Sequence, residues 1–498
     1  MTVSLLHRDV EGVMCDFSMP GENPFNTDPE DPLCRPTNPA PFHGQGMIDW
    51  LHERDIKVLV WVLNFINDGT AHGIGEFAGQ AEREAPVYAF AQRMGYLLPE
   101  ARKWHRGHGG PVDYENPEAV AWWHRMMDKV MDMGLDGFVL DGGPRPDYIS
   151  DIYNYIVSKK GSDGLMISHS APENVPFTML IWAIDTKGDF SDRGILYAID
   201  QSLKTQKNGT PFTTGTQSPS GPPQHPHFLI REAQFNAFCP ALLTFIGADL
   251  SNPWERGPDV ERNYKYYVRL HNELLPYIYS EVINAHRTGT PIMRQTPGDR
   301  QYLFGPNLLV APVYRDVTVR MVAFPEGLWI NYWQQREVFP HRITTDVPAP
   351  LDQIPLFIRA GAIIPMEVKA DWTGHGSRGS KGFATILVYP HETSEYAWRG
   401  RNGDTYFRCA TDGKYPTKQD VRISFTGLER RYLLRVKCFA SVKSVILEGE
   451  GRLERFRSFR AFDAAETGWY RQRVKDLVLV KLPALSSGTV TISVREKE

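Results

Sequence analysis

The sequence lacks several features that mark common classes of protein. Its cysteines are few, five in 498 residues, and they are widely spaced and form no CxxC pair. A disulfide framework or a structural zinc site is therefore not expected. No run of about 18 apolar residues occurs, so no membrane-spanning helix is expected. The 55 basic and 59 acidic residues give a formal charge of −4, which argues against a nucleic-acid partner.

The remaining composition is that of a globular protein, with 42% hydrophobic and 12% aromatic residues. A chain of 498 residues is long enough for about three domains, or for one large barrel with appended domains. The first residues contain no apolar stretch of the kind found in a signal peptide, so a complete chain of this sequence would be cytoplasmic. No internal repeat is present, and the sequence does not indicate whether the protein forms a homo-oligomer.

Short apolar runs alternate with helical stretches from residue 10 to about residue 290, the pattern of parallel strands joined by helices. Helices are predicted over 119–133 and 263–286. No GxGxxG motif follows the first strand, which favours a (β/α)8 TIM barrel over a dinucleotide-binding sheet. The barrel would be one strand short at its N-terminus. The predicted strands are 12–17, 56–65, 137–140, 165–168, 180–184, 211–215 and 241–247.

After Thr290 the helical periodicity ends and β-rich segments separated by turn residues follow. We expect two accessory β-sandwich domains in this part of the chain. The predicted boundaries are 1–290 for the barrel, 291–366 for the proximal sandwich and 367–498 for the distal sandwich. The polar, glycine-rich stretch 371–381 is expected to be a surface loop.

Polar residues that end apolar strands are the candidate catalytic groups, because the carboxyl ends of barrel strands converge on one face. Asp141 and Asp185 each end such a strand, and Asp16, His169 and Gln217 stand in similar positions. Two carboxylates on one face suit glycosidic cleavage, in which one attacks the anomeric carbon and the other protonates the leaving oxygen. From position alone, a strand-end Asp is as readily a helix cap or an ion-pair partner.

Aromatic residues near these strand ends could stack on a sugar ring: Trp61, Trp104, Phe138 and Trp182. For any one of them, packing in the core is the simpler alternative. The histidines of the segments HRGH (105–108) and HPH (225–227) lie in Gly- and Pro-rich loops without an acid at ligand spacing. We therefore expect no metal site and no cofactor.

Three segments after the barrel carry a specific resemblance to a known family. LVAPVYRD (309–316), FPEGLWINYW (324–333) and IPLFIRAGAIIPM (354–366) closely resemble glycoside hydrolase family 31, which contains α-glucosidases and α-xylosidases. The segment 273–294 is similar to the last barrel helix and exit of that family, and VDYENPEAVAWW (112–123) to a stretch before its fourth strand. The resemblance implies a TIM barrel and a retaining α-glycosidase mechanism.

The same resemblance implies roles for individual residues. Asp141, in GLDGFVLDGGP, matches the nucleophile after strand four, and Asp185, in IWAIDTKGD, matches the acid/base after strand six. Asp189 is the second candidate for the acid/base because it keeps the family's GD pair. Asp16 matches the strand-two Asp that binds the non-reducing sugar, and Trp182 lies close to the matching offset of the family's WxGD motif. Trp61 is a further substrate-binding candidate.

The sequence also departs from the family pattern. Ser-His-Ser with His169 stands where the family has an Arg, Gln217 stands where it has an Asp, and its RNHS stretch is absent. The chain also starts near strand two, without the family's N-terminal sandwich and first strand. Loss of sugar ligands changes substrate preference or weakens catalysis. The first hypothesis is thus a retaining exo-acting α-glycosidase that acts on an oligosaccharide or glycoside. Four alternatives remain: an α-transglycosylase, a catalytically impaired glycan-binding barrel, a subunit of a larger assembly, and a barrel whose Asp residues bind metal.

Overall fold

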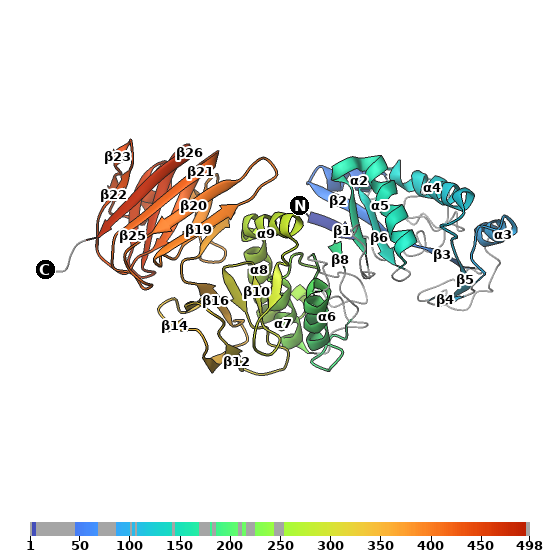
Figure 1. Ribbon diagram of the computed structural model, residues 1–498, viewed down its shortest axis with the longest axis horizontal. Helices are drawn as coiled ribbons and strands as arrows, with labels where there is room; N and C mark the ends of the chain where they lie inside the picture. The colour runs from blue at the N-terminus through green and yellow to red at the C-terminus, as the bar shows by residue number, and fades with distance from the viewer. Residues whose placement is uncertain are drawn as a thin grey trace. The chain divides into compact units, whose positions relative to one another are not determined.

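The computed structural model describes residues 2–5, 45–67, 86–99, 102–104, 107–141, 145–168, 180–181, 186–207, 212–215, 225–243 and 253–494. The chain divides into two compact units, residues 1–182 and 183–498. The first unit contains a parallel sheet and its helices, and the second contains further helices followed by β-rich regions (Figure 1).

The main sheet of the first unit is parallel throughout, with strand order β1-β2-β6-β7-β8 (Figure 1). Strands β2, β6, β7 and β8 confirm predicted strands, whereas β1 was not predicted and the predicted strand 12–17 lies outside the described residues. The apolar residues 58–60, 62 and 63 of β2 and 138–140 of β6 are at most 2% exposed, as parallel strands covered on both faces require. The bounds are β1 (Thr2–Leu5), β2 (Ile56–Leu63), β6 (Gly137–Asp141), β7 (Leu165–Ser168) and β8 (Leu180–Ile181).

Helices connect these strands, as the sequence predicted for α4 (Pro117–Met131). Asn116 caps α4, since its Oδ1 accepts hydrogen bonds from the backbone nitrogens of Glu118 at 3.0 Å and Ala119 at 3.4 Å. Trp123 is buried on the inner face of this helix. The other helices are α2 (Gln45–His52), α3 (Pro86–Arg93) and α5 (Pro146–Lys160), and a small antiparallel sheet holds β3 (Phe65–Asn67), β4 (Arg102–Trp104) and β5 (Gly107–Pro111).

The start of β6 is fixed by two local features. Asp136 Oδ2 accepts a hydrogen bond from the backbone nitrogen of Val58 at 2.8 Å and lies 2.8 Å from His52 Nε2. Gly137 has a φ of +154°, and a Cβ there would lie 1.8 Å from the carbonyl oxygen of Leu165. Only glycine fits this position, so the sequence itself sets the register of β6 between β2 and β7.

In the described part of the second unit, four α-helices precede the β-rich regions, and all four contribute buried residues to its main apolar core. The sequence predicted one helix over 263–286, but two helices meet at Leu274. Pro276 explains the break, because proline has no N–H to donate inside a continuous helix. The helices are α6 (Ile195–Lys207), α7 (Pro226–Asn236), α8 (Pro258–Glu273) and α9 (Leu275–Thr288).

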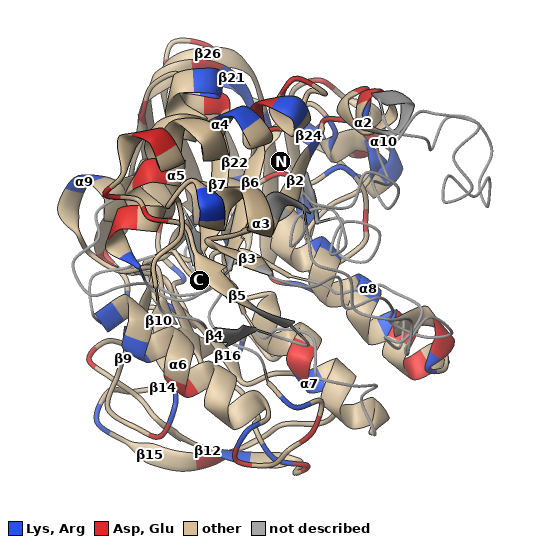
Figure 2. Cartoon of the chain, turned by 90° about the vertical axis from the view of Figure 1, so that its right-hand side faces the viewer, with Lys and Arg blue, Asp and Glu red and all other residues tan. Residues whose placement is uncertain are grey.

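Charged residues of both signs alternate on the exposed face of α8, as Figure 2 shows. Arg262 pairs with Asp259 and Lys265 with Glu261, at helical spacings of three and four residues. Such exposed pairs contribute little to stability, so this is a solvated helix face. Within the described residues, no helix is long and apolar enough to cross a bilayer.

A six-stranded and a two-stranded sheet follow the helices. Phe324, Trp329 and Phe357 belong to the cluster of buried residues that packs between them. The larger sheet has the order β14-β13-β16-β11-β10-β9, and β12 pairs with β15. The bounds are β9 (Met293–Gln295), β10 (Tyr302–Phe304), β11 (Leu308–Val310), β12 (Val319–Ala323), β13 (Trp329–Asn331), β14 (Val338–Phe339), β15 (Thr344–Pro348) and β16 (Leu356–Arg359).

A ten-stranded sheet forms the end of the chain. The sequence indicates two separate strand-bearing stretches, 421–426 and 431–442, but residues 421–437 form one 17-residue strand, β21, which pairs with β26 across two register shifts. Strand β17 joins this sheet, although the sequence placed residues up to 366 in the proximal sandwich; the three predicted domain boundaries remain predictions. The strands are β17 (Ile363–Met366), β18 (Ala384–Val388), β19 (Thr393–Trp398), β20 (Thr405–Ala410), β21 (Val421–Lys437), β22 (Val442–Leu447), β23 (Gly451–Arg452), β24 (Arg455–Phe456), β25 (Gly468–Gln472) and β26 (Leu477–Val494), with helix α10 (Phe459–Ala464).

Candidate active site

Asp141 is the last residue of β6, where it pairs with Leu63 at the end of β2. The preceding residues, 138–140, are at most 1% exposed. Because all strands of this sheet run in the same direction, Asp141 stands at the carboxyl edge, the edge at which the active sites of TIM barrels lie. Its side chain lies outside the described part of the structure, so its catalytic role remains a prediction.

Two further polar residues end strands at this edge. Asn64 directly follows β2 and is 3% exposed, and Ser168 ends β7 and is 2% exposed. Asn64 was not predicted as a site residue, although the rule that selected Asp141 also selects it: Asn64 is the first polar residue after the run VLVWVL. Asn64 is therefore a candidate for positioning substrate beside Asp141.

The chain after Asp141 is anchored on the way into α5. Arg145 Nε donates a hydrogen bond to Asp147 Oδ1 at 3.2 Å, and the hydrogen bonds to Asp147 raise the pKa of the Arg145 guanidinium. Tyr148 donates its hydroxyl proton to the carbonyl oxygen of Val62 at 2.7 Å, which ties α5 to β2. These contacts fix the backbone shortly after the predicted nucleophile.

The structure describes only some of the aromatic side chains that were candidates for stacking on a sugar. Phe138 is fully buried, with its ring 6.3 Å from that of Tyr155, so it packs in the core, the simpler of the two interpretations. Trp61 lies within β2 and pairs with Val139 through the backbone, and Trp104 ends β4. The side chains of both tryptophans lie outside the described part, so the role of Trp61 in substrate binding remains a prediction.

Five predicted site residues lie outside the described residues altogether: Asp16, His169, Trp182, Asp185 and Gln217. Asp141 belongs to the first unit of the chain and Asp185 to the second. The separation of about 5 to 5.5 Å that a retaining glycosidase requires between its two carboxyl groups is therefore a prediction for this pair.

Asp189, the second candidate for the acid/base, has a local structural role. Its Oδ1 accepts a hydrogen bond from the backbone nitrogen of Ser191 at 2.9 Å and another from the Ser191 hydroxyl at 2.5 Å. A Cβ at Gly194 would lie 1.9 Å from the Asp189 carbonyl oxygen, so this turn before α6 is tight. Asp189 therefore stabilises this turn, and the choice between Asp185 and Asp189 as the acid/base remains a prediction.

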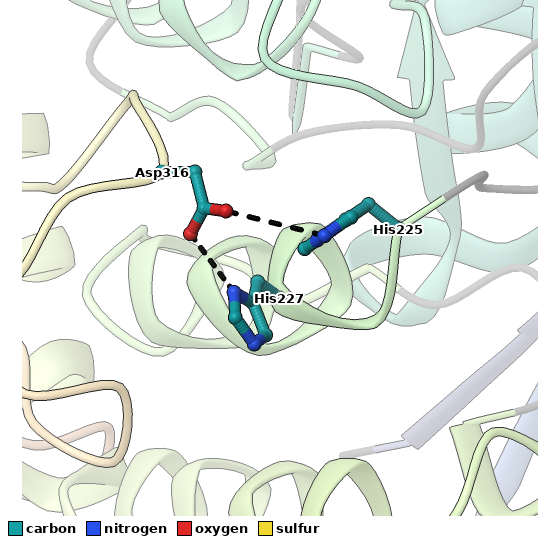
Figure 3. A group of neighbouring side chains, drawn as sticks. All are labelled: His225, His227 and Asp316. Carbon is teal, nitrogen blue, oxygen red and sulfur yellow. Dashed lines mark hydrogen bonds and ion pairs between the residues drawn. The ribbon is translucent and has the colours of Figure 1, made fainter.

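His225, His227 and Asp316 come together in the second unit (Figure 3). His227 Nδ1 lies 2.9 Å from Asp316 Oδ1, and His225 Nε2 lies 4.0 Å from Asp316 Oδ2. Asp316 is 89 residues later in the chain than His227, so the sequence around HPH shows no acid at ligand spacing. Two imidazoles and a carboxylate can bind zinc, but the described contacts are those of an exposed ion pair, and the expectation that no metal is needed remains a prediction.

Two models of one carbohydrate-active family match the chain. A model described as the glycosyl hydrolases family 31 TIM-barrel domain matches residues 15–175, and one described as the family 31 C-terminal domain matches residues 283–364. This chain belongs to glycoside hydrolase family 31. Its fold is that family's TIM barrel followed by a C-terminal domain, as predicted. The family 31 barrel match includes Asp16, Trp61, Asp141 and His169, and it ends before Asp185 and Gln217.

Family 31 enzymes are also found among curated relatives. An isomaltosyltransferase from Sporosarcina globispora is 24% identical, over 89% of this chain and 45% of the relative. Alpha-glucosidase 2 from Bacillus thermoamyloliquefaciens is 32% identical, over 38% of this chain and 26% of the relative. The family 31 chain described here thus spans less than half the length of these relatives.

Solved structures of family 31 proteins have the same fold. The cycloalternan-forming enzyme from Listeria monocytogenes, in complex with a pentasaccharide substrate, gives a TM-score of 0.76 at 22% identity, over 90% of this chain and 47% of that chain. A family 31 dextranase from Flavobacterium johnsoniae, complexed with glucose, gives 0.75 at 19% identity, over 90% and 63%. At these identities the likeness concerns the fold.

Proposed function

We propose that this protein is a retaining, exo-acting α-glycosidase that removes terminal α-linked sugars. The observation that carries the proposal is the position of Asp141, which ends β6 at the carboxyl edge of a family 31 barrel sheet. Membership of family 31 indicates the class of reaction, glycoside hydrolysis with retention. The end of β6 places the Asp141 carboxylate at the edge of the sheet where that reaction requires a nucleophile.

The proposed reaction has two steps. The Asp141 carboxylate attacks the anomeric carbon while Asp185 donates its proton to the leaving oxygen, which gives a covalent glycosyl-enzyme and a free alcohol. Asp185 then removes a proton from water, and the resulting hydroxide displaces Asp141 and releases the sugar with its original anomeric configuration. In this account, Asp16, Trp61, His169, Trp182 and Gln217 bind the substrate.

A transglycosylase is the second candidate, because it uses the same first step and replaces water with a sugar hydroxyl. The match to an isomaltosyltransferase over 89% of the chain favours it. Product analysis separates the two: a hydrolase releases free sugar at a rate independent of added acceptor, whereas a transglycosylase forms longer oligosaccharides as acceptor is added.

The decisive experiment measures hydrolysis of aryl α-glycosides by the wild type, by Asp141→Asn and by Asp132→Asn. Asp132 is an exposed C-cap residue of α4, so its variant makes the same chemical change away from the strand edge. We expect turnover by the wild type and the control, a loss of at least about a thousand-fold in Asp141→Asn, and release of the α-anomer first. No turnover by any of the three proteins, with glycan binding intact, would instead support a non-catalytic glycan-binding barrel.

A further inference from the structure

A concave pocket in the second unit contains an unusual concentration of positive charge. Its volume is about 510 Å³, within the range of small-molecule sites. It is lined by the end of β21, by the segments 332–337 and 373–375, and by the turn 474–477. All of these residues lie in the second unit, so the pocket is formed without any residue of the strands that carry Asp141.

Arg435 and Lys437 enter this pocket from β21 and are nearly fully buried, at 6% and 5% exposed. One Arg435 amino group donates to the carbonyl oxygen of Gly374 at 3.3 Å, whereas its buried Nε has no hydrogen-bond partner among the described residues. Lys437 Nζ donates to the carbonyl oxygen of Lys475 at 2.6 Å, and Lys475 Nζ donates to the same Gly374 oxygen at 3.0 Å. The three cations thus bind neutral backbone oxygens.

The acids of the pocket do not balance this charge. Asp476 forms two hydrogen bonds with Arg336, at 2.8 and 3.0 Å, so its charge is already paired. Glu337, the other acid in the lining, is exposed and accepts a hydrogen bond from Asn331. Asp371 and Glu273 act on Arg435 from outside the lining, and Asp476 acts on Lys437, but among the described residues neither cation forms an ion pair. A buried cation without an ion-pair partner costs several kcal/mol. A bound anion would remove that cost.

The effect of burial on the pocket's ionisable groups agrees with this imbalance. Desolvation lowers the pKa of Arg435 to about 10 and that of Lys437 to about 8, so both are largely charged at neutral pH. Desolvation, together with the charges of Arg435, Lys475 and Lys437, lowers the pKa of His375 to about 3. His375 is therefore neutral, and the positive charge comes from the three longer side chains.

Aromatic side chains form the rest of the wall. The Tyr332 and Trp333 rings are 4.8 Å apart and nearly perpendicular, and Trp333 Nε1 donates to the carbonyl oxygen of Ile354 at 2.7 Å. The Tyr332 hydroxyl lies 2.7 Å from His375 Nε2. These contacts hold the rings in fixed orientations beside the cations. The flat face of a fixed aromatic ring next to fixed cations suits a sugar ring that carries a negative group.

We propose that this pocket binds an anionic sugar unit, with the sugar's acidic group on Arg435 and Lys437 and its ring against Trp333. The guanidinium of Arg435 carries its N–H donors in one plane, and a planar donor group suits the two oxygens of a carboxylate. This assignment does not rest on glycosidase activity, because binding can be measured without turnover.

The test is isothermal titration calorimetry of the full chain with D-glucuronate, with D-glucose and with inorganic sulfate. We expect glucuronate to bind at least about ten-fold more tightly than either of the others, since it combines charge with a ring. Equal affinity for sulfate and glucuronate would show a site for inorganic anions and overturn the sugar assignment. Absence of glucuronate binding would overturn the whole proposal.

Variants connect the binding to the pocket. Lys437→Met should weaken glucuronate binding at least about ten-fold, and Lys475→Gln, at an exposed lysine of the same pocket, provides a second test without disturbing the core. Arg473→Gln is the matched control, because Arg473 is an exposed cation close in sequence that does not line the pocket. Equal affinities in Lys475→Gln and Arg473→Gln, with glucuronate bound, would contradict the assignment.

Discussion

The guanidinium of Arg231, on α7, donates a hydrogen bond to the carbonyl oxygen of Ala349, 2.6 Å away and 118 residues later in the chain. The same group also donates to the carbonyl oxygens of Val317 at 3.0 Å and Gln353 at 3.1 Å. Arg231 is 2% exposed, and desolvation lowers its pKa to about 10, so it is charged at neutral pH. One side chain therefore joins α7 to two loops of the proximal β-sandwich.

We expect Arg231→Met to lower the free energy of unfolding by about 3 to 5 kcal/mol, because several buried carbonyl oxygens lose their donor at once. Denaturant unfolding followed by circular dichroism measures this. Arg262→Met is the control, since Arg262 is 69% exposed and forms an exposed ion pair with Asp259; it should change stability by less than about 1 kcal/mol. Similar losses in both variants would show that burial of Arg231 does not matter.

Gly137→Ala should distort β6 at its start. The added Cβ would lie 1.8 Å from the carbonyl oxygen of Leu165, and the backbone φ of +154° is itself unfavourable for alanine. We expect a loss of about 3 kcal/mol or more, together with most of the glycosidase activity, because β6 carries Asp141. Thermal unfolding and an aryl glycoside assay on the same samples measure both effects.

Gly95→Ala is the control for this prediction. Gly95 also has a positive φ, of +70°, but a Cβ there would meet no atom within 4 Å. Its variant should lose only roughly 1 to 2 kcal/mol, the cost of the backbone conformation, and should keep its activity. If Gly137→Ala behaved like Gly95→Ala, the close approach to Leu165 would not be what fixes β6.

The sequence predicted the parallel strands well because their signal is local. Strands β6 and β7 are short apolar runs bounded by turn residues, and the predictions match them within one residue. The division of one predicted helix into α8 and α9 was missed, although Pro276 marks it. The continuity of β21 could not be read from the sequence, because β26 holds this strand together by pairing across the polar stretch 427–431.

Some candidate functional residues could be predicted from the sequence and others could not, for a physical reason. Asp141 could be found because a carboxylate that ends an apolar strand is visible in the sequence. The charged pocket at Arg435 could not be predicted, because its residues come from segments that are distant in sequence. What marks it as a binding site is that its buried cations form no ion pair, and only the folded structure reveals that. The pairing of His227 with Asp316 was missed for the same reason, since only the fold brings the two together.

Glu273 should make stability depend on pH near neutrality. Its carboxyl group is 1% exposed, and desolvation raises its pKa from 4.5 to about 7. The folded protein therefore holds a proton that the unfolded chain releases between these values, so stability falls as pH rises through about 7.

Glu273→Gln should remove this dependence. Relative to the wild type, the variant should become more stable by about 1 to 3 kcal/mol between about pH 5 and pH 8, since one pKa unit corresponds to about 1.4 kcal/mol. Denaturant unfolding at several pH values gives the difference. Parallel pH profiles for the two proteins would show that Glu273 is ionised throughout.

Asp185→Ala and Asp189→Ala should separate the two acid/base candidates. We expect Asp185→Ala to lose about 100- to 10,000-fold in kcat on a poor leaving group and much less on a glycosyl fluoride, which needs no proton. Asp189→Ala should keep kcat and lose about 1 kcal/mol of stability with the contacts to Ser191. The reverse pattern of leaving-group dependence would move the acid/base role to Asp189.

The most direct test of the central claim is to trap the glycosyl-enzyme with a fluorinated glycosyl fluoride and to locate the label by peptide mass spectrometry. The account predicts a single label on Asp141, the residue that ends β6. A label on any other carboxylate, with Asp141 unmodified, would contradict it.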